Sequence, residues 1–389
     1  MSASASARST DVVRSACLTL AVVCAAACAT VPSPRAEQSL AARAAAEEAA
    51  LAKRVKARDD PALAEYLAGI ARRLQPDAGA LRITVLEDPT LAAWAMPGGR
   101  IYVHTGLLSR LEDEAQLAVI LARELGRVGP AAAREPARRA REPFPRTPLS
   151  PVAAAILGLD LRIAATSAIS GHGADVERDA DRDAVQRLRA AGYDAGAALG
   201  LFARLATTRD ERGALEIFLY GSPPRMGERY ESFRALLPAA GAPPSAVVGA
   251  LSPSFRDRLR RVVRDNAALD IRAGRFTLAR SELERVLAAG PPDAVAELYY
   301  GDLYRLRSQR APAAERAEYL TQARARYERA QALDVAYAEP FRQLGLLYYQ
   351  ERDAARARGA FERYLALAPE APDAPRIRGY LDAMEPARP

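Results

Sequence analysis

The alternation of apolar and polar residues predicts a small mixed α/β region in the first half of the chain. Leu81–Leu86 alternates and stops at Asp88-Pro89, as expected of a strand that ends in a turn. The segments AWAM (93–96) and RIYVH (100–104), with the Pro-Gly-Gly between them, predict a hairpin. From 112 to 128 apolar residues recur every three or four positions, the period of an amphipathic helix.

Helical periods also occur on both sides of this region. Apolar spacing predicts one or two helices over 36–75 and further helices over 152–168 and 174–192. Residues 129–150 are rich in Pro and Arg, which predicts a loop. The Pro-, Ala-, Gly- and Ser-rich stretch 238–254 indicates a domain boundary.

Beyond this boundary the pattern repeats at about 34 residues, the spacing of tetratricopeptide repeats. Small residues at fixed offsets would let paired helices approach, with aromatic residues between them. One copy is lengthened by about ten residues at 307–317 relative to that spacing. The clearest copy holds Phe341, Leu344, Gly345, Tyr348, Ala357, Phe361, Tyr364 and Pro369. We expect three stacked helix pairs capped by 374–384, with unrelated amphipathic helices as the alternative.

The charge pattern does not suggest nucleic-acid binding. The 389 residues hold 55 Lys and Arg against 48 Asp and Glu, a net charge of +7. Nearly all cations are Arg, spread along the chain among acidic residues, so no basic stripe is formed. His occurs only at 104 and 172, and all three Cys lie in the first thirty residues, which excludes disulfides elsewhere in this chain.

The amino terminus resembles a secretory signal. Arg8 and Arg14 precede the apolar run Ser15–Ala27, which is too short to span a bilayer. Ala25-Ala26-Ala27-Cys28 resembles a bacterial lipobox, so we expect lipidation at Cys28 and a periplasmic, outer-membrane lipoprotein of a Gram-negative bacterium. Ordinary cleavage, giving a soluble secreted protein, is the alternative.

Several ordered blocks resemble a zinc metallopeptidase family, which includes CAAX prenyl proteases, heat-shock membrane proteases and the beta-barrel-assembly-enhancing protease. The longest is Ala93–Val128, with AWAMPGGRIYVHTGLL and ARELGRV. Glu177–Asp181, Ala191–Asp194 and 222–229 resemble later family blocks, so the likeness covers about 60–235. It implies an α+β, mostly helical fold: a metallopeptidase-like domain with a small sheet or hairpin, followed by an α-solenoid of tetratricopeptide repeats.

The resemblance also assigns site residues. In the family, two His one helical turn apart bind zinc, the Glu after the first is the general base, and a Glu on a later helix is the third ligand. The base position is Glu124 and the third-ligand position is Glu177, with Asp181 nearby. Both His positions are Arg, at 123 and 127, so the HExxH motif becomes RExxR.

This exchange predicts loss of the metal. A guanidinium group stays protonated and has no free lone pair, so it cannot replace a neutral imidazole. We therefore expect no cofactor, no metal at Arg123, Arg127 and Glu177, and no function for Glu124 as a base. Our hypothesis is that the two Arg replace the charge of zinc, pair with Glu177 and Glu124, and join the two helices. The alternative is that both Arg extend to solvent. A zinc site moved to His104 and His172 is disfavoured, because they lack helical spacing.

These patterns predict five segments. They are a signal or lipoprotein peptide (1–28), a linker with an amino-terminal helix (29–59), the metallopeptidase-like domain (60–237), a linker (238–257) and tetratricopeptide-like repeats (258–385).

We predict a catalytically inactive adaptor or chaperone-like binder, lipid-anchored, with envelope or outer-membrane proteins and extended polypeptide segments as partners and no nucleic acid. Polypeptide would add to an edge strand, as the family's substrate does, or lie in the repeat groove. The expected edge residues are Gly99, Arg100, Ile101, Tyr102 and Val103. One alternative is an active metalloendopeptidase with unorthodox ligands and zinc, which degrades misassembled envelope proteins. Another is that the carboxyl-terminal repeats alone carry the function.

Overall fold

The computed structural model describes residue 46 and residues 48–77, 81–96, 99–126, 174–207, 223–237 and 253–384. The predicted signal with Cys28, the 129–150 loop, the 152–168 helix, Arg127 and His172 lie outside these residues. Contacts divide the chain into two units, Met1–Glu48 and Ala49–Pro389. The second unit is described below. No helix among the described residues has both the length and the apolar character that crossing a membrane requires.

A three-stranded sheet forms the centre of the first part of this unit. It consists of β1 (Arg82–Leu86), β2 (Ala93–Met96) and β3 (Arg100–His104), in the order β1-β3-β2. β2 and β3 pair antiparallel, which confirms the predicted hairpin, and β1 pairs with β3 in parallel. Gly99 has φ 76°, a value that favours glycine, in the turn before β3.

The prediction of an edge strand at Gly99, Arg100, Ile101, Tyr102 and Val103 is wrong. β3 is the central strand, with β1 bonded to one side and β2 to the other. The amide of Arg82 also donates to the carbonyl of Gly99, at 2.9 Å. Because both hydrogen-bonding edges are occupied, no added polypeptide strand can pair there.

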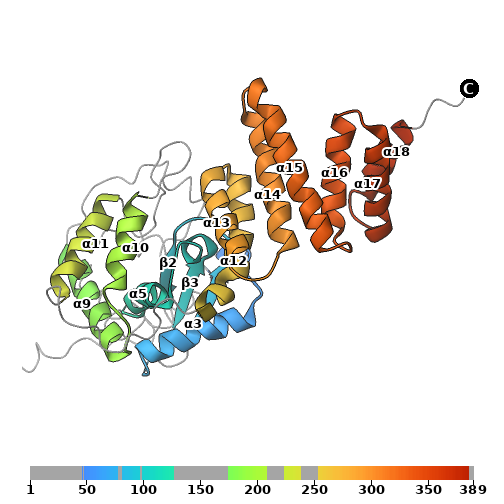
Figure 1. Cartoon of the computed structure of the whole chain (residues 1–389). Helices are drawn as coiled ribbons and strands as arrows, with labels where there is room; N and C mark the ends of the chain where they lie inside the picture. Colours follow the sequence, from blue (N-terminus) through green and yellow to red (C-terminus); the bar gives the residue numbers. More distant parts are fainter. Residues whose placement is uncertain are drawn as a thin grey trace, which may run out of the picture. The chain divides into compact units, whose positions relative to one another are not determined.

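Helix α5 is the most buried element of this part. It spans Glu114–Leu125, begins at Asp113, whose side chain accepts a hydrogen bond from the Gln116 amide, and has every residue buried. It contacts β2 and helices α3, α9 and α10. Helices α9, α10 and α11 lie together beside the sheet in Figure 1. The helices of this part are α3 (Pro61–Leu74), α4 (Thr105–Leu108), α5, α9 (Ala174–Ala190), α10 (Ala197–Thr207) and α11 (Pro223–Leu236).

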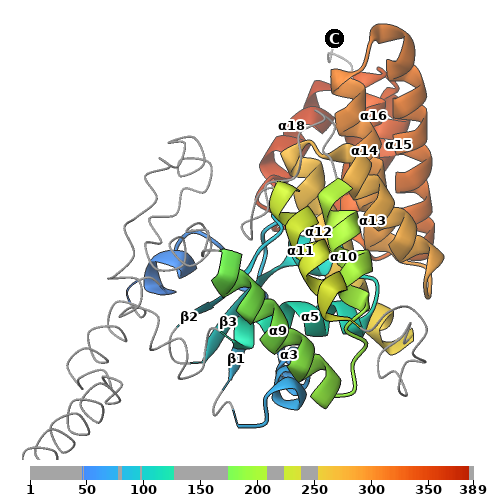
Figure 2. The same ribbon diagram turned by 90° about the vertical axis from the view of Figure 1, so that its left-hand side faces the viewer.

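The carboxyl-terminal part is entirely helical. Consecutive helices pack in pairs, α12 with α13, α14 with α15 and α16 with α17 (Figures 1 and 2). The helices are α12 (Pro253–Ala273), α13 (Phe276–Ala288), α14 (Ala294–Arg310), α15 (Ala313–Leu333), α16 (Ala338–Gln350), α17 (Ala354–Leu367) and α18 (Ala374–Ala383).

Glycines set the close approach of two of these pairs. Gly345 of α16 faces Phe361 of α17, and a Cβ atom at Gly345 would lie 2.5 Å from Cδ1 of the ring. Gly301 of α14 faces Tyr327 of α15 in the same way. Both contacts are of the kind that the sequence offsets predict. The α14–α15 pair is longer than the α16–α17 pair, because α14 and α15 have 17 and 21 residues, whereas α16 and α17 have 13 and 14.

Helix α12 begins earlier than predicted and packs against the sheet-containing part. It starts at Pro253, so residues 253–257 are helical rather than part of the expected 238–257 linker. Its Asn266 is fully buried and accepts a hydrogen bond from Oγ1 of Thr105 in α4, at 2.9 Å. Local composition identifies the Pro- and Gly-rich stretch but carries no information on such a distant contact.

Candidate functional site

Helices α5 and α9 bring Arg123 and Asp181 together. Arg123 lies in the last turn of α5, and its Nε donates a hydrogen bond to Oδ1 of Asp181 on α9 at 2.9 Å. Both side chains are only 2 % exposed. A charged hydrogen bond thus joins the two helices at Arg123, a position that the sequence resemblance assigns to a metal ligand.

Burial makes this ion pair important for the fold. A charge is expensive to remove from water unless an opposite charge accompanies it. Removing one partner of a buried pair costs about 3–5 kcal/mol, whereas an exposed pair contributes about 0–1 kcal/mol. The Arg123–Asp181 pair is therefore a strong link between α5 and α9.

The hypothesis of an internal cluster concerns Arg123 and Arg127, of which the structure describes Arg123. Arg123 is buried, so the alternative in which it extends to solvent is wrong for this residue. The carboxylate that the structure places on its Nε is Asp181, which the sequence analysis put only near the site. Glu124 is fully buried beside it on α5. Pairing of the Arg residues with Glu124 and Glu177 stays a prediction, because Arg127 and the Glu177 side chain lie outside the described residues.

The described donor set does not suit zinc at the family position. The Arg123 guanidinium has no lone pair to offer, and its Nε–H is directed at Asp181. Elsewhere in the described ranges, no group of three or more His, Cys, Asp and Glu side chains could hold a metal ion. We therefore assign no metal-dependent step to these residues.

His104 has local hydrogen-bond partners. Its ring is buried at the end of β3, with Nδ1 2.7 Å from Oγ1 of Thr90 and 3.3 Å from Oδ1 of Asp88. Burial alone would raise the pKa of Asp88, but hydrogen bonds with His104 and Thr90 outweigh it and hold that pKa well below its usual value. These contacts fix the ring within the sheet region.

Glu114 is a buried anchor that the sequence analysis missed. Its carboxylate accepts hydrogen bonds from Tyr66 at 2.5 Å, Tyr193 at 2.7 Å and Arg73 at 2.6 Å. Burial raises the pKa of Glu114, yet these three donors outweigh that effect and lower it. The only sequence signal was Tyr193 in the Ala191–Asp194 block. This block follows α9, and the Tyr193 hydroxyl links it to Glu114 at the start of α5.

A second missed cluster joins α12 and α13 to the segment between α4 and α5. The Arg110 guanidinium pairs with Asp270 of α12 at 3.3 Å and with Glu282 of α13. Asn266 donates to Glu282 at 3.0 Å and to Oγ of Ser109 at 3.3 Å. All five residues are buried. Their pattern along the sequence is that of polar helix faces, so only the fold reveals their burial.

Comparison with known proteins relates this domain to a family of peptidases. Residues 57–237 match the model of peptidase family M48. The match covers the sheet, α5 and α9, and it supports the metallopeptidase family indicated by the sequence blocks. Residues 57–237 are thus similar to the peptidase domains of family M48.

A relative with a more specific name is found in Vibrio cholerae. Its beta-barrel assembly-enhancing protease is 31% identical over 167 residues, which cover 38% of this chain and 34% of that protein. The match therefore spans about a third of the relative's length. Its name describes a protease that enhances β-barrel assembly.

Proposed function

We propose that the chain is a non-hydrolytic M48-type protein that acts as an adaptor or chaperone-like binder in the bacterial envelope. The observation that carries this proposal is the Arg123–Asp181 ion pair, buried at the place where the family binds zinc. The M48 match and the beta-barrel assembly-enhancing protease from Vibrio cholerae support an envelope-associated, peptidase-like protein.

The ion pair opposes hydrolysis in two ways. The metal of such a peptidase polarises the scissile carbonyl and makes its bound water acidic enough to lose a proton near neutral pH. A cationic guanidinium at the ligand position repels a dication and supplies no electron pair. Without that metal, the Glu124 carboxylate has no activated water to deprotonate. In its place, the ion pair gives the domain a link between α5 and α9.

The carboxyl-terminal helices supply the binding part of the proposal. The recurring Gly–aromatic contacts at Gly301–Tyr327 and Gly345–Phe361 support a reading as tetratricopeptide repeats. Such repeats present extended concave surfaces. We propose that these helices receive envelope or outer-membrane proteins as extended segments, while a lipid on Cys28 holds the protein at the periplasmic face of the outer membrane.

Metal content and proteolysis of the full chain test the loss of activity. We expect purified wild-type protein to contain no stoichiometric zinc and to leave casein intact. The R123H/R127H variant restores the two imidazoles, so it should gain zinc if the rest of the pocket is intact. Adding E124Q to that variant provides a matched control, because it should keep the zinc and lose any hydrolysis.

The alternative is an active metalloendopeptidase, which the retained Glu124 on the buried helix α5 favours. Stoichiometric zinc in the wild-type chain, together with casein hydrolysis that EDTA abolishes, would overturn the proposal and establish this alternative. Zinc in R123H/R127H without zinc in the wild type would instead support the proposed non-hydrolytic protein.

A further inference from the structure

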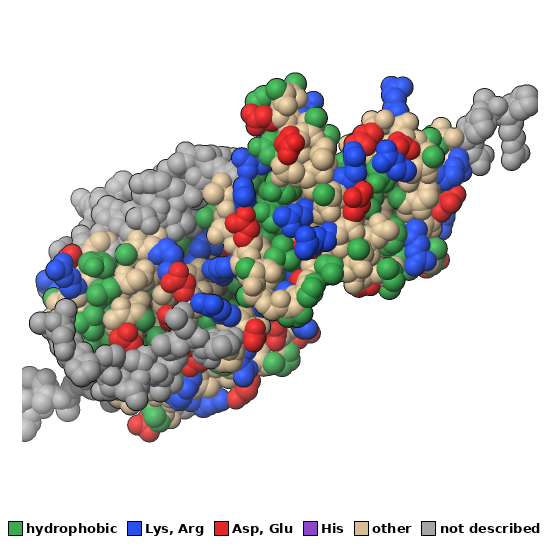
Figure 3. All heavy atoms as spheres, viewed as in Figure 1, with side chains coloured by type: hydrophobic (Ala, Val, Ile, Leu, Met, Phe, Trp, Pro, Cys, Tyr) green, Lys and Arg blue, Asp and Glu red, His purple; other side chains and the backbone are tan. Residues whose placement is uncertain are grey.

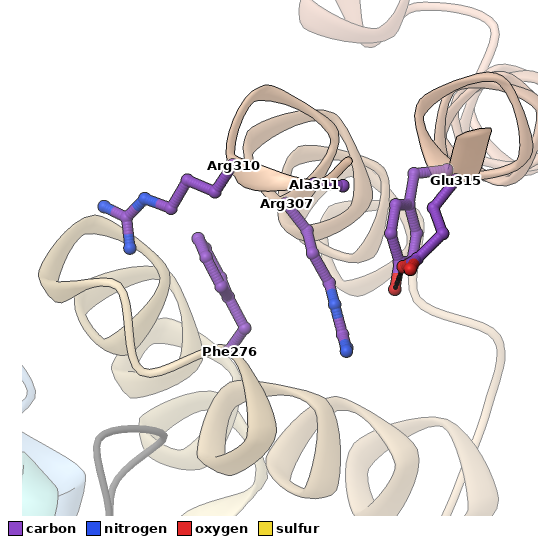
Figure 4. Close-up of a pocket in the computed structure, with 6 residues that line it drawn as sticks. Phe276, Arg307, Arg310, Ala311 and Glu315 are labelled. Atoms are coloured by element: carbon purple, nitrogen blue, oxygen red, sulfur yellow. Dashed lines mark hydrogen bonds between the residues drawn. The ribbon is translucent and has the colours of Figure 1, made fainter. Parts of the chain in front are cut away.

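The lengthened α14–α15 pair builds a small polar pocket. The pocket has a volume of about 180 Å³. Its lining residues are Phe276, Arg307, Arg310, Ala311, Glu315 and Tyr319 (Figure 4). All except Phe276 belong to the end of α14, the start of α15 or the turn between them. The extra residues of this copy therefore create a feature beyond those that the repeat pattern predicts.

Aromatic rings orient the two guanidinium groups of the pocket. Arg307 lies over the Tyr319 ring with its Cζ 5.1 Å from the centroid, and Arg310 lies over the Phe276 ring at 5.0 Å. A stacked guanidinium uses its face in this contact and keeps its N–H groups in the plane for other partners. The rings thus restrain the arginines without consuming their hydrogen-bond donors.

Neither arginine has a carboxylate within ion-pair distance among the described residues. Nearby arginines of the same helices do, since Arg326 pairs with Glu297 at 2.8 Å and Arg324 pairs with Glu351. Basic and acidic side chains are interspersed on the face shown in Figure 3. Arg307 and Arg310 therefore have donor capacity that the fold does not use.

The backbone around the pocket accommodates these side chains. Gly274 ends the turn after α12 with φ 77°, and a Cβ atom there would collide with the Arg310 guanidinium. Figure 4 shows the Arg307 side chain between Phe276 and Glu315, with Arg310 on the other side of Phe276. Arg307 is thus the direct donor into the pocket, and Arg310 adds positive potential from beside it.

We propose that this pocket binds a carboxylate side chain of an extended polypeptide. Two arginines against the single Glu315 leave one net positive charge, which matches one carboxylate. A phosphate dianion fits less well, because the Glu315 carboxylate in the wall would repel its second charge. That the ligand is a polypeptide rests on the proposed adaptor role. The recognition of a carboxylate by this pocket is independent of the chemistry at Arg123.

Fluorescence anisotropy with the full chain tests the pocket. The probe is a fluorescein-labelled, carboxyl-amidated peptide of Gly, Ser and two Glu residues, compared with a twin in which both Glu are Gln. We expect the Glu peptide to bind about tenfold more tightly, as for a charge-assisted hydrogen bond to Arg. R307Q should remove about this factor, and R310Q, whose guanidinium lies against Phe276 at the side of the pocket, about threefold.

Two further variants sharpen the test. E315Q removes a like charge and should tighten binding of the Glu peptide by about twofold. R316Q removes an exposed cation of α15 that does not line the pocket, so it should leave binding unchanged. The Glu-against-Gln comparison on wild-type protein needs no variant, so it stands even if R307Q lowers the melting temperature.

Several results would overturn the inference. Equal binding of the Glu and Gln peptides, including no binding of either, would show that the pocket does not recognise a carboxylate. Unchanged affinity in R307Q places the binding elsewhere. Stronger competition by inorganic phosphate than by acetate assigns the pocket to phosphate. Zinc content measured on the same protein reports separately on the proposed loss of hydrolysis, so the two failures are distinguishable.

Discussion

Arginine serves two opposite purposes in the two halves of this chain. In the sheet-containing part, Arg123 is buried and bonded to Asp181, so its charge holds two helices together. In the carboxyl-terminal part, Arg307 is stacked on a tyrosine at a pocket and has no acidic partner within the described residues. The difference shows that the environment of an arginine, more than its presence, separates a structural link from a candidate ligand site.

The largest expected effect comes from breaking the buried pair. D181A leaves the Arg123 guanidinium buried without this carboxylate, and it should lower the free energy of unfolding by about 3–5 kcal/mol. Urea denaturation followed by circular dichroism measures the change. The control is E351A, which removes the partner of Arg324 in a pair with side chains 26 % and 30 % exposed. That change should cost at most about 1 kcal/mol. Equal losses in the two variants would contradict the distinction drawn here.

Glycine substitutions should give an intermediate effect whose sign depends on the contact. G345A puts a Cβ atom against the Phe361 ring and should destabilise the chain by about 1–3 kcal/mol through overpacking. G359A lies on the exposed side of α17, where a Cβ atom meets nothing within 4 Å. It should stabilise the chain by about 0.5–1 kcal/mol, because alanine favours a helix. Thermal melts of both variants measure these effects, and a stabilising G345A would contradict the close approach of α16 and α17.

The smallest effect concerns acid stability at Glu114. Its pKa is lowered in the folded chain, so it contributes stability above its unfolded pKa, and this contribution is lost as the pH falls through the folded pKa. Y193F removes one donor and should cost about 1 kcal/mol near neutral pH. Its free energy of unfolding should also decline less steeply than that of the wild type below about pH 4.5. Parallel curves for the two proteins across this range would show that Tyr193 does not hold the carboxylate.

The sequence predicts the local elements well and the long-range pairings poorly. The hairpin of β2 and β3 and helices α5 and α9 follow from alternation and helical period. That β1 also pairs with β3 cannot be read from a local pattern, because the two strands are separated by β2 along the chain. The edge-strand prediction failed for this reason.

At the candidate site, too, the sequence predicts the local features but not the long-range contacts. The replacement of both ligands by Arg is visible in seven residues of sequence, and it predicts the loss of metal ligation from the chemistry of guanidinium alone. The choice of Asp181 as the partner of Arg123 depends on how α9 lies against α5. The pocket at Arg307 also includes Phe276, which lies about thirty residues earlier in the chain. A local sequence pattern therefore cannot predict this pocket.

The buried cluster around Asn266 has a mechanical consequence. Arg110, Asp270 and Glu282 connect α12 and α13 directly to the segment that leads into α5, so these contacts hold the carboxyl-terminal helices against the sheet-containing part. A partner that pulls on the last helices would therefore transmit the load to the sheet and to α5. A protease that nicks the 238–252 stretch should accordingly leave the two fragments associated.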